Sequence, residues 1–361
     1  MGNARALKAP MKNTSHVTVA QIDEFEDVID VRSPAEFALD HVPGARNYPV
    51  LDNEERARVG TLYASSPFEA RKLGAALLAR NVARHLEEAF ATQPAGWRPL
   101  VYCWRGGKRS GAMTHILREV GWRAFTLQGG YQAYRRAVVA ELETLPLHHS
   151  FRVISGPTGS GKSLLLHELA AQGAQVLDLE GLARHRGSVL GGLPDDPQPT
   201  QKAFESSLRQ ALRSFKADTP VFVEAESRKI GNLHLPNALL ERMRASPCLR
   251  VEPPRAERVR FLMSEYRHLS DRPQLLRVRL EQLSALQPRS VIAHWMACIE
   301  AGAWAELTTD LLEKHYDPLY RKSMGRNYPA QDEELRPDSL TPAGLAACAA
   351  RMLQSRDAVM A

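Results

Sequence analysis

The sequence predicts an α/β protein of two consecutive domains, each built around a parallel sheet. Two stretches of the chain carry this prediction, because each runs from a short apolar strand through a glycine-rich turn into the start of a helix. The first stretch is residues 99–117 and the second is residues 151–169. The length of 361 residues supports the prediction, because it exceeds one ordinary domain and suits two. Between the two stretches the apolar pattern breaks at residues 144–150, where we place the domain boundary.

The composition is that of a soluble globular protein, with 44% hydrophobic and 24% charged residues. No apolar run approaches the roughly 20 residues needed to cross a bilayer, and Met1–Lys12 lacks the apolar core of a signal peptide. The cysteines lack disulfide or metal-ligand spacing, which fits a reducing cytoplasm. They are Cys103, Cys248, Cys298 and Cys348. A net charge of +6 permits a polyanionic partner but does not require one. We therefore expect a cytoplasmic protein without a membrane segment.

The first domain is expected to span residues 16–143, after a disordered leader over residues 1–15. Short strands are predicted at His16–Val19 and Val28–Arg32, because both runs are apolar and rich in β-branched residues. Residues 53–98 are rich in Ala, Arg, Glu and Leu, and their apolar positions recur at helical spacing. This pattern predicts a helical insert before the cysteine-containing stretch.

Cys103 stands at the end of a predicted strand and just before a predicted helix. Unpaired N–H groups and the helix dipole favour negative charge there, and neighbouring cations add to the effect. We therefore predict a nucleophile with its pKa lowered from about 8.5 to roughly 3.5–7.5, rather than a buried structural cysteine. Arg109 completes a C-x5-R loop, which can enclose a tetrahedral oxyanion while the Arg donates to two of its oxygens. The other residues expected to bind this anion are Arg105, Gly106, Gly107, Lys108 and Ser110.

The second stretch contains a complete G-x-x-x-x-G-K-S loop between a strand at Phe151–Ser155 and a helix at Leu164–Leu169. Its backbone N–H groups would bind a diphosphate, Lys162 would meet the terminal phosphate, and Ser163 would bind Mg²⁺. Glu224 ends a later strand and is the second expected Mg²⁺ ligand, a role that Glu226, two residues further on, could share. No adenine-binding signature is visible, so the motif indicates a phosphate site rather than ATP. The residues of the loop are Gly156, Pro157, Thr158, Gly159, Ser160, Gly161, Lys162 and Ser163.

The second domain is expected to span residues 151–325, with a helical C-terminal part, and to be followed by a tail over residues 326–361, in which a last helix is expected at Pro342–Leu353. Many arginines lie between residues 255 and 279. They are explained either as charged helix faces, which is the simpler reading, or as contacts to a nucleic-acid backbone. For a shorter cationic group near the P-loop, anion contact and simple solvation remain equally open. The candidate contacts are Arg184, His185, Arg186, Arg267 and Arg277.

The first domain resembles rhodanese domains, which are sulfurtransferases. The resemblance is carried by Tyr102–Ser110, by Asp30–Asn47 and by the Gly-Gly turn within Leu127–Tyr134. Ordinary rhodaneses have one residue fewer in the cysteine loop, and the longer form is similar to that of rhodanese-shaped phosphatases and arsenate reductases. The longer loop implies a substrate with the bulk of a phosphate. Asp30 and His41 are most simply explained as residues that brace the neighbouring loops.

A rhodanese-like domain followed directly by a P-loop NTPase-like domain resembles the tRNA 2-selenouridine synthase family. The resemblance covers about Thr18 to Arg321. Besides the two loops, it is carried by Asp178–Ser188, Glu224–Gly231 and His315–Arg321. Each of these motifs is long, so their combination is specific.

The resemblance implies a two-step replacement of sulfur by selenium in 2-thiouridine at the wobble position of tRNA. In the first step, geranyl diphosphate alkylates the sulfur, and the P-loop with Lys162 and Mg²⁺ would stabilise the leaving diphosphate. In the second step, selenium from selenophosphate displaces the S-geranyl group. The C-x5-R loop would bind selenophosphate, and Cys103 would take its selenium as a Cys–Se intermediate. We expect the enzyme to be a monomer.

Two alternatives remain open. One is an ATP-dependent tRNA sulfurtransferase, or a rhodanese-type sulfurtransferase, whose P-loop hydrolyses a nucleotide. The other is a non-catalytic adaptor that uses both anion sites for docking. The presence of Cys103 argues against the adaptor, because inactive rhodanese modules commonly lack the cysteine.

Overall fold

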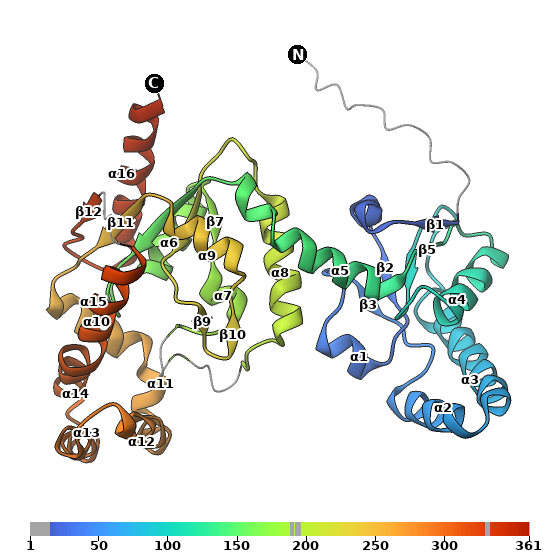
Figure 1. Ribbon diagram of the computed structural model, residues 1–361, viewed down its shortest axis with the longest axis horizontal. Helices are drawn as coiled ribbons and strands as arrows, with labels where there is room; N and C mark the ends of the chain where they lie inside the picture. Colours follow the sequence, from blue (N-terminus) through green and yellow to red (C-terminus); the bar gives the residue numbers. More distant parts are fainter. Residues whose placement is uncertain (1–14, 188–190, 192–195, 329–332, 361) are drawn as a thin grey trace. The chain divides into compact units, whose positions relative to one another are not determined.

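The computed structural model describes residues 15–187, 191, 196–328 and 333–360 (Figure 1). The chain divides after Ala140 into two compact units, which we call the N-terminal unit and the C-terminal unit. Nearly all of the predicted leader lies outside the described residues. Within the described part of the chain, every helix is too short or too polar to span a membrane.

The N-terminal unit contains a five-stranded sheet in the order β1-β5-β4-β2-β3, in which every pair is parallel. Its strands are His16–Val17 (β1), Val28–Asp30 (β2), Arg46–Asn47 (β3), Leu100–Tyr102 (β4) and Phe125–Leu127 (β5). The middle strand β4 and its neighbour β2 are buried along their whole length, as expected for a parallel sheet covered on both faces. Asp30 pairs in register with Tyr102, so the residues that follow these two strands meet at one edge of the sheet.

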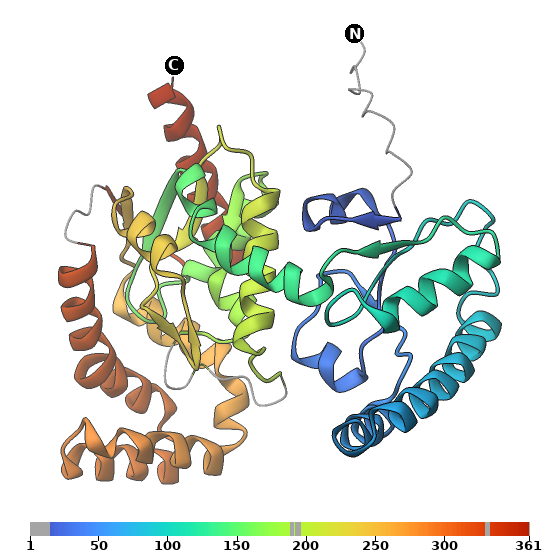
Figure 2. The same cartoon turned by 45° about the vertical axis from the view of Figure 1, so that its right-hand side comes forward.

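The predicted helical insert is confirmed as far as Glu88, where its second helix ends. Its two helices lie side by side (Figure 2). A Cβ added to Gly74 would lie 3.3 Å from Cγ1 of Val59, so this glycine lets the pair approach closely. The rest of the predicted insert forms turns, because Pro94 and Gly96 do not support a helix. The helices of the unit are Val19–Glu24 (η1), Pro34–Leu39 (α1), Asn53–Ser65 (α2), Pro67–Glu88 (α3), Lys108–Glu119 (α4) and Gly130–Leu142 (α5).

The C-terminal unit contains a second parallel sheet of five strands, in the order β12-β11-β6-β8-β7. Its strands are Phe151–Ser155 (β6), Gln175–Leu177 (β7), Val221–Glu224 (β8), Cys248–Val251 (β11) and Glu333–Leu335 (β12). A separate antiparallel pair joins Lys229–Ile230 (β9) to Leu233–His234 (β10). The middle strand of the sheet is β6, so the loop that follows it lies at the centre of the carboxyl edge.

The prediction of a C-terminal tail was wrong for most of its length, because residues from this segment complete the sheet and its core. β12 extends the sheet beside β11, and the last helix packs against α6. Leu340, Leu345 and Met352 are buried with Leu166 of α6, which explains why the segment is not a tail. The helices around this sheet are Leu145–His148 (η2), Lys162–Ala171 (α6), Leu179–Ala183 (α7), Gln201–Ser214 (α8), Asn237–Arg244 (α9) and Pro342–Met360 (α16).

The predicted helical part of the C-terminal unit has a core of its own, and we call this part the helical lobe. Trp295 is fully buried at its centre, and the indole N–H donates to Oδ2 of Asp310 at 2.9 Å. A π-helical turn, Leu312–Tyr316 (η4), joins its last two helices. The other elements of the lobe are Arg255–Glu265 (α10), Arg267–Ser270 (α11), Pro273–Glu281 (α12), Gln282–Ala285 (η3), Arg289–Ala301 (α13), Trp304–Leu311 (α14) and Asp317–Asn327 (α15).

Candidate functional site

The cysteine loop, Cys103–Ser110, connects β4 to α4, as the sequence predicts. Cys103 follows the middle strand of the sheet directly, and α4 begins at Lys108. The N-cap residue is Gly107, which has no side chain to satisfy the first N–H groups of the helix. These N–H groups are therefore available to an anion or to the Cys103 sulfur.

Cys103 is buried, with 3% of its surface exposed, and hydrogen-bond donors of its own loop face the sulfur. The Ser110 hydroxyl donates to Sγ at 3.2 Å. Burial alone would raise the pKa of Cys103, but this hydrogen bond and the N–H groups of Ser110, Arg105 and Gly107 hold the pKa below its ordinary value. A lowered pKa of Cys103 is what the sequence predicts, although hydrogen bonds rather than the nearby cations account for it. The nucleophilic role of Cys103 stays a prediction.

The cysteine loop rests directly on the Gly-Gly turn that precedes α5. Gly106 and Gly130 have φ angles of +65° and +56°. A Cβ on Gly130 would lie 2.3 Å from the carbonyl oxygen of Cys103 and 2.4 Å from the nitrogen of Gly106, so only glycine fits there. The N–H of Tyr131 donates to the same Cys103 carbonyl at 2.8 Å. This contact fixes the backbone on one side of the sulfur.

The cations of the cysteine loop are divided between an ion pair and the solvent. Nη1 of Arg109 donates to Oε2 of Glu36 at 2.9 Å, and Arg105 and Lys108 are exposed. Burial alone would raise the pKa of Glu36, but Arg109 holds it below its usual value. Glu36 also accepts from the N–H of Ser33 at 3.2 Å at the start of α1. Arg109 therefore stands beside the loop with its charge balanced, and its bidentate contact with an oxyanion stays a prediction.

Asp30 and His41 act as braces, which was the simpler reading of the sequence. Asp30 accepts a hydrogen bond from Nη2 of the buried Arg32 at 2.6 Å. The guanidinium of Arg32 lies 3.9 Å from the centre of the Tyr131 ring, at the start of α5. Nδ1 of His41 lies 2.9 Å from the carbonyl oxygen of Phe37, and the two rings stack. Arg32 was not among the predicted site residues, although an Asp-x-Arg pattern at a strand end was an available signal.

The P-loop, Gly156–Ser163, joins β6 to α6, which confirms the strand–loop–helix context of the motif. Gly159 and Gly161 have φ angles of +78° and +77°, which favour glycine. Nζ of Lys162 donates to the carbonyl oxygen of Gly156 at 2.8 Å, so the ammonium group lies over the loop. Binding of phosphate by this loop stays a prediction.

A cluster of carboxylates lies beside the P-loop. The Ser163 hydroxyl donates to Oε2 of Glu180 at 2.8 Å, and the N–H of Glu180 donates to Oε1 of Glu224 at 2.7 Å. Burial, with Glu180 and Asp178 nearby, raises the pKa of Glu224 well above its usual range. Burial and the Glu180 carboxylate raise the pKa of Glu226 to about 8. The predicted ligands Ser163 and Glu224 thus belong to one cluster, which Glu180 links.

Glu180 is the residue of this cluster that the sequence analysis missed. It lies just after β7, whereas Glu224 ends the neighbouring strand β8. Parallel strands end at one edge of a sheet, and this rule was the available signal. Oε2 of Glu224 is buried and has no hydrogen-bond partner among the described residues. The oxygen donors of Ser163, Glu180 and Glu224 are the kind that Mg²⁺ prefers, so the cluster fits this ion.

A cavity of about 750 Å³ opens between the P-loop, the carboxylates and the helical lobe. Arg184, His185 and Arg186, which the sequence analysis singled out, all line it. Nη2 of Arg186 lies 3.2 Å from Oε2 of Glu265, and its guanidinium lies 5.1 Å from the centre of the Tyr266 ring. Burial, with a smaller contribution from a nearby arginine, lowers the pKa of His185. Contact of these three residues with an anion stays a prediction.

The arginines between residues 255 and 279 have different environments. Arg258 is buried, pairs with Asp317 and donates from Nε to the carbonyl oxygen of Thr158 at 2.9 Å, so it supports the P-loop. Nη2 of Arg277 donates to Oε1 of Glu300 at 2.7 Å. Arg267 is exposed at the start of α11. Contact of Arg267 and Arg277 with RNA stays a prediction.

Comparison with known proteins matches each unit to a known domain family. Residues 7–137 match the rhodanese-like domain, and residues 149–274 match the tRNA 2-selenouridine synthase AAA domain. The tRNA 2-selenouridine synthase of Bdellovibrio bacteriovorus is 33% identical over 342 residues, which cover 83% of this chain and 89% of that protein. The chain belongs to the tRNA 2-selenouridine synthase family.

Other members of the tRNA 2-selenouridine synthase family match a shorter stretch. The protein of Nitrosomonas europaea is 39% identical over 244 residues, which cover 66% of this chain and 63% of that relative, less than two thirds of its length. Among solved structures, a rhodanese-related protein from Thermoplasma volcanium is 18% identical, with a TM-score of 0.23, over 34% of this chain and 92% of that chain. The AAA-domain match ends at residue 274, so most of the helical lobe lies beyond it.

Proposed function

We propose that this chain is a tRNA 2-selenouridine synthase, which converts 2-thiouridine of tRNA into 2-selenouridine in two steps. One observation carries the proposal: a single chain holds two glycine-rich loops at strand ends, with different chemistry at each. Cys103 is a buried thiol with a lowered pKa, whereas Lys162 is an ammonium group on a P-loop. The names of the relatives support this activity and imply a tRNA substrate.

The first proposed step is S-geranylation at the P-loop. The sulfur of 2-thiouridine attacks C1 of geranyl diphosphate, the S–C bond forms, and the C–O bond breaks with its electron pair leaving on diphosphate. The N3–H proton of the base passes to the departing diphosphate, so the S-alkylated base is neutral. The P-loop N–H groups and Lys162 would stabilise the charge that develops on this leaving group. Ser163, Glu180 and Glu224 would hold Mg²⁺, which neutralises diphosphate charge when it is bound.

The second proposed step is selenation at the cysteine loop. The hydrogen-bond donors converge on the position of Sγ, so the oxygens of a phosphoryl group bound there would surround the sulfur. Its phosphorus would then face Sγ of Cys103, and its selenium would point out of the loop. We propose that Cys103 attacks phosphorus: an S–P bond forms, the P–Se bond breaks, and selenide leaves with the electron pair.

The released selenide attacks C2 of the modified uridine and displaces the geranyl thiolate, while water hydrolyses the phosphorylated cysteine to free enzyme and phosphate. Selenium stays at the selenide level and phosphorus stays fully oxidised, so no redox partner is needed. The Cys–Se intermediate expected from the sequence is the alternative. It would leave phosphorus reduced, and a thiol would later have to reduce the S–Se bond.

The proposal is tested with purified protein and tRNA that carries 2-thiouridine. Geranyl diphosphate with Mg²⁺ should give S-geranyl-2-thiouridine, and subsequent selenophosphate should give 2-selenouridine, as measured by nucleoside mass spectrometry. Absence of the S-geranyl product together with nucleotide hydrolysis and thiosulfate:cyanide activity would favour the nucleotide-hydrolysing sulfurtransferase. Intact-protein mass spectrometry during turnover distinguishes a phosphorylated Cys103 from one that carries selenium.

A further inference from the structure

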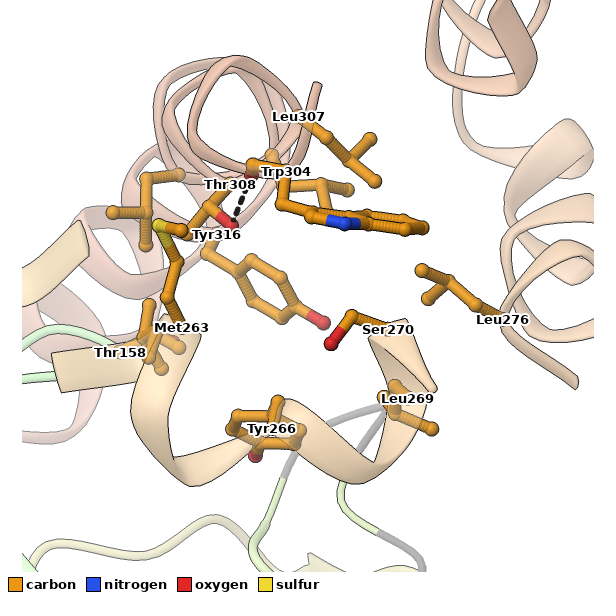
Figure 3. Close-up of a pocket in the computed structure, with 13 residues that line it drawn as sticks. Thr158, Met263, Tyr266, Leu269, Ser270, Leu276, Trp304, Leu307, Thr308 and Tyr316 are labelled. Carbon is orange, nitrogen blue, oxygen red and sulfur yellow. Dashed lines mark hydrogen bonds between the residues drawn. The ribbon is translucent and has the colours of Figure 1, made fainter. Parts of the chain in front are cut away.

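A second, smaller cavity of about 110 Å³ lies in the helical lobe beside the P-loop (Figure 3). Leucine, methionine and aromatic side chains from α10, α11, α12, α14 and η4 form most of its wall. None of the 13 described residues that line it carries a charge. Five of these residues carry a hydroxyl group, and two of the hydroxyls are turned to the backbone: Thr308 donates to the carbonyl oxygen of Trp304 and Ser270 to that of Arg267, both at 2.7 Å. The surface of the cavity therefore suits a hydrocarbon.

This apolar cavity adjoins the cavity of the P-loop. Thr158, a residue of the P-loop, lines both cavities, and so do Tyr266 and Tyr316. A Cβ added to Gly159 would lie 2.7 Å from Cγ of Leu262, which also lines both, so the loop and α10 are in close contact. A ligand whose diphosphate binds to the P-loop can therefore place an attached apolar chain in the helical lobe.

The residues at the junction suit the place where a charged head meets an apolar chain. Arg186 lies over the Tyr266 ring on the side of the P-loop cavity, whereas the described residues in the wall of the apolar cavity carry no charge. Aromatic rings also stabilise positive charge, which develops on the allylic C1 when diphosphate leaves. The π-helical turn η4 ends at Tyr316, whose ring projects into the cavity (Figure 3).

We propose that this apolar cavity binds the hydrocarbon chain of the prenyl diphosphate and limits its length. The inference rests on the proposed function and adds the chain-binding residues to it. Thr158 lies on one side of the cavity, and Leu276 lies on the opposite side, next to the Trp304 indole (Figure 3). A chain that enters from the P-loop therefore ends against Trp304 and Leu276. The size of these two side chains sets the longest prenyl group that fits.

The first test fills the cavity. Ser270→Phe should raise the Kd for geranyl diphosphate by about tenfold or more, because it removes space for apolar burial. The Kd for inorganic diphosphate should stay within about twofold, since the P-loop is unchanged. Ser264→Phe is the matched control, because Ser264 is exposed on α10 and lines neither cavity. Calorimetry of the wild type and of both variants with each ligand measures these Kd values. Binding of inorganic diphosphate also reports that each variant is folded.

The second test enlarges the cavity. Trp304→Ala should raise the ratio of farnesyl to geranyl transfer onto 2-thiouridine tRNA by about tenfold or more. The longer farnesyl chain then gains apolar contact in the enlarged cavity instead of clashing with the indole. Trp122→Ala, which removes a half-buried tryptophan from the N-terminal unit, should leave the ratio unchanged. If the wild type geranylates normally but Ser270→Phe leaves the Kd values unchanged and Trp304→Ala leaves the farnesyl-to-geranyl ratio unchanged, this inference alone is overturned. Failure of the wild type to bind or transfer geranyl would overturn the proposed function as well.

Discussion

The cysteine loop and the P-loop are built alike but present different functional groups, a thiol and an ammonium group. Each follows the middle strand of a parallel five-stranded sheet and leads into a helix, α4 or α6. In each, positive φ angles at glycine allow the backbone to turn tightly, as at Gly106 and Gly159. The shared geometry makes both loops suitable for oxyanions, because N–H groups at a helix N-terminus remain without intrahelical partners.

The difference lies in what the side chains add to this geometry. In the cysteine loop the hydrogen bonds converge on the Cys103 sulfur, and Glu36 is paired with Arg109. In the P-loop the side chain is the cation Lys162, and beside it burial and the Glu180 carboxylate raise the pKa of Glu226 to about 8. Under the proposed function, one loop geometry therefore stabilises an attacking group in one unit and a leaving group in the other.

The largest expected effect distinguishes the proposed roles of the two loops. Cys103→Ala should abolish formation of 2-selenouridine while geranylation stays largely intact, because only the second step uses the thiolate. Nucleoside analysis of the variant should show accumulated S-geranyl-2-thiouridine. Persistence of selenation in Cys103→Ala would contradict the role assigned to the cysteine loop.

The complementary change should slow the other step. Lys162→Ala should reduce geranylation by a factor of about 10² to 10³, because it removes one preorganised charge from the leaving group. Selenation of tRNA that is already geranylated should change little. Rates of the two steps, measured separately, check this expectation. An equal loss in both steps would instead assign the P-loop a structural or RNA-positioning role.

A milder change tests why the cysteine loop favours an anion. Ser110→Ala should raise the pKa of Cys103, because the hydroxyl no longer donates to Sγ. The thiolate is the reactive form, so the rate of alkylation by iodoacetamide, plotted against pH, should shift to higher pH. The Cys103→Ala protein corrects for reaction at other cysteines. Thr114→Ala, which removes another buried hydroxyl of α4, should leave the profile unchanged.

The sequence was sufficient to predict both loops and the sheets that hold them. Each motif is contiguous, and its strand and helix lie within a few residues, so local pattern determines the geometry. The parallel sheets follow from strands that alternate with helices. The family resemblance rested on the same contiguous motifs, and the comparisons confirm it.

Features assembled from distant parts of the chain could not be predicted in this way. The Ser163–Glu180 contact depends on how β7 lies beside β8, and Arg258 supports the P-loop from about 100 residues away. The packing of α16 onto α6 also joins the end of the chain to its middle. The apolar cavity combines residues from five elements, none of which shows the cavity in its own sequence.

The smallest expected effect concerns the binding of tRNA by arginines of the helical lobe. If the arginines of α11 and α12 contact the tRNA backbone, Arg267→Ala should make tRNA binding less dependent on salt, because fewer counterions are released. The slope of log K against the logarithm of the salt concentration should fall by about one. Arg277→Ala should change it less, because Glu300 already balances this charge, and should lower the melting temperature slightly. Binding at several salt concentrations, beside melting curves, measures both effects. A salt dependence that stays unchanged in Arg267→Ala would assign this arginine to the solvated surface of its helix.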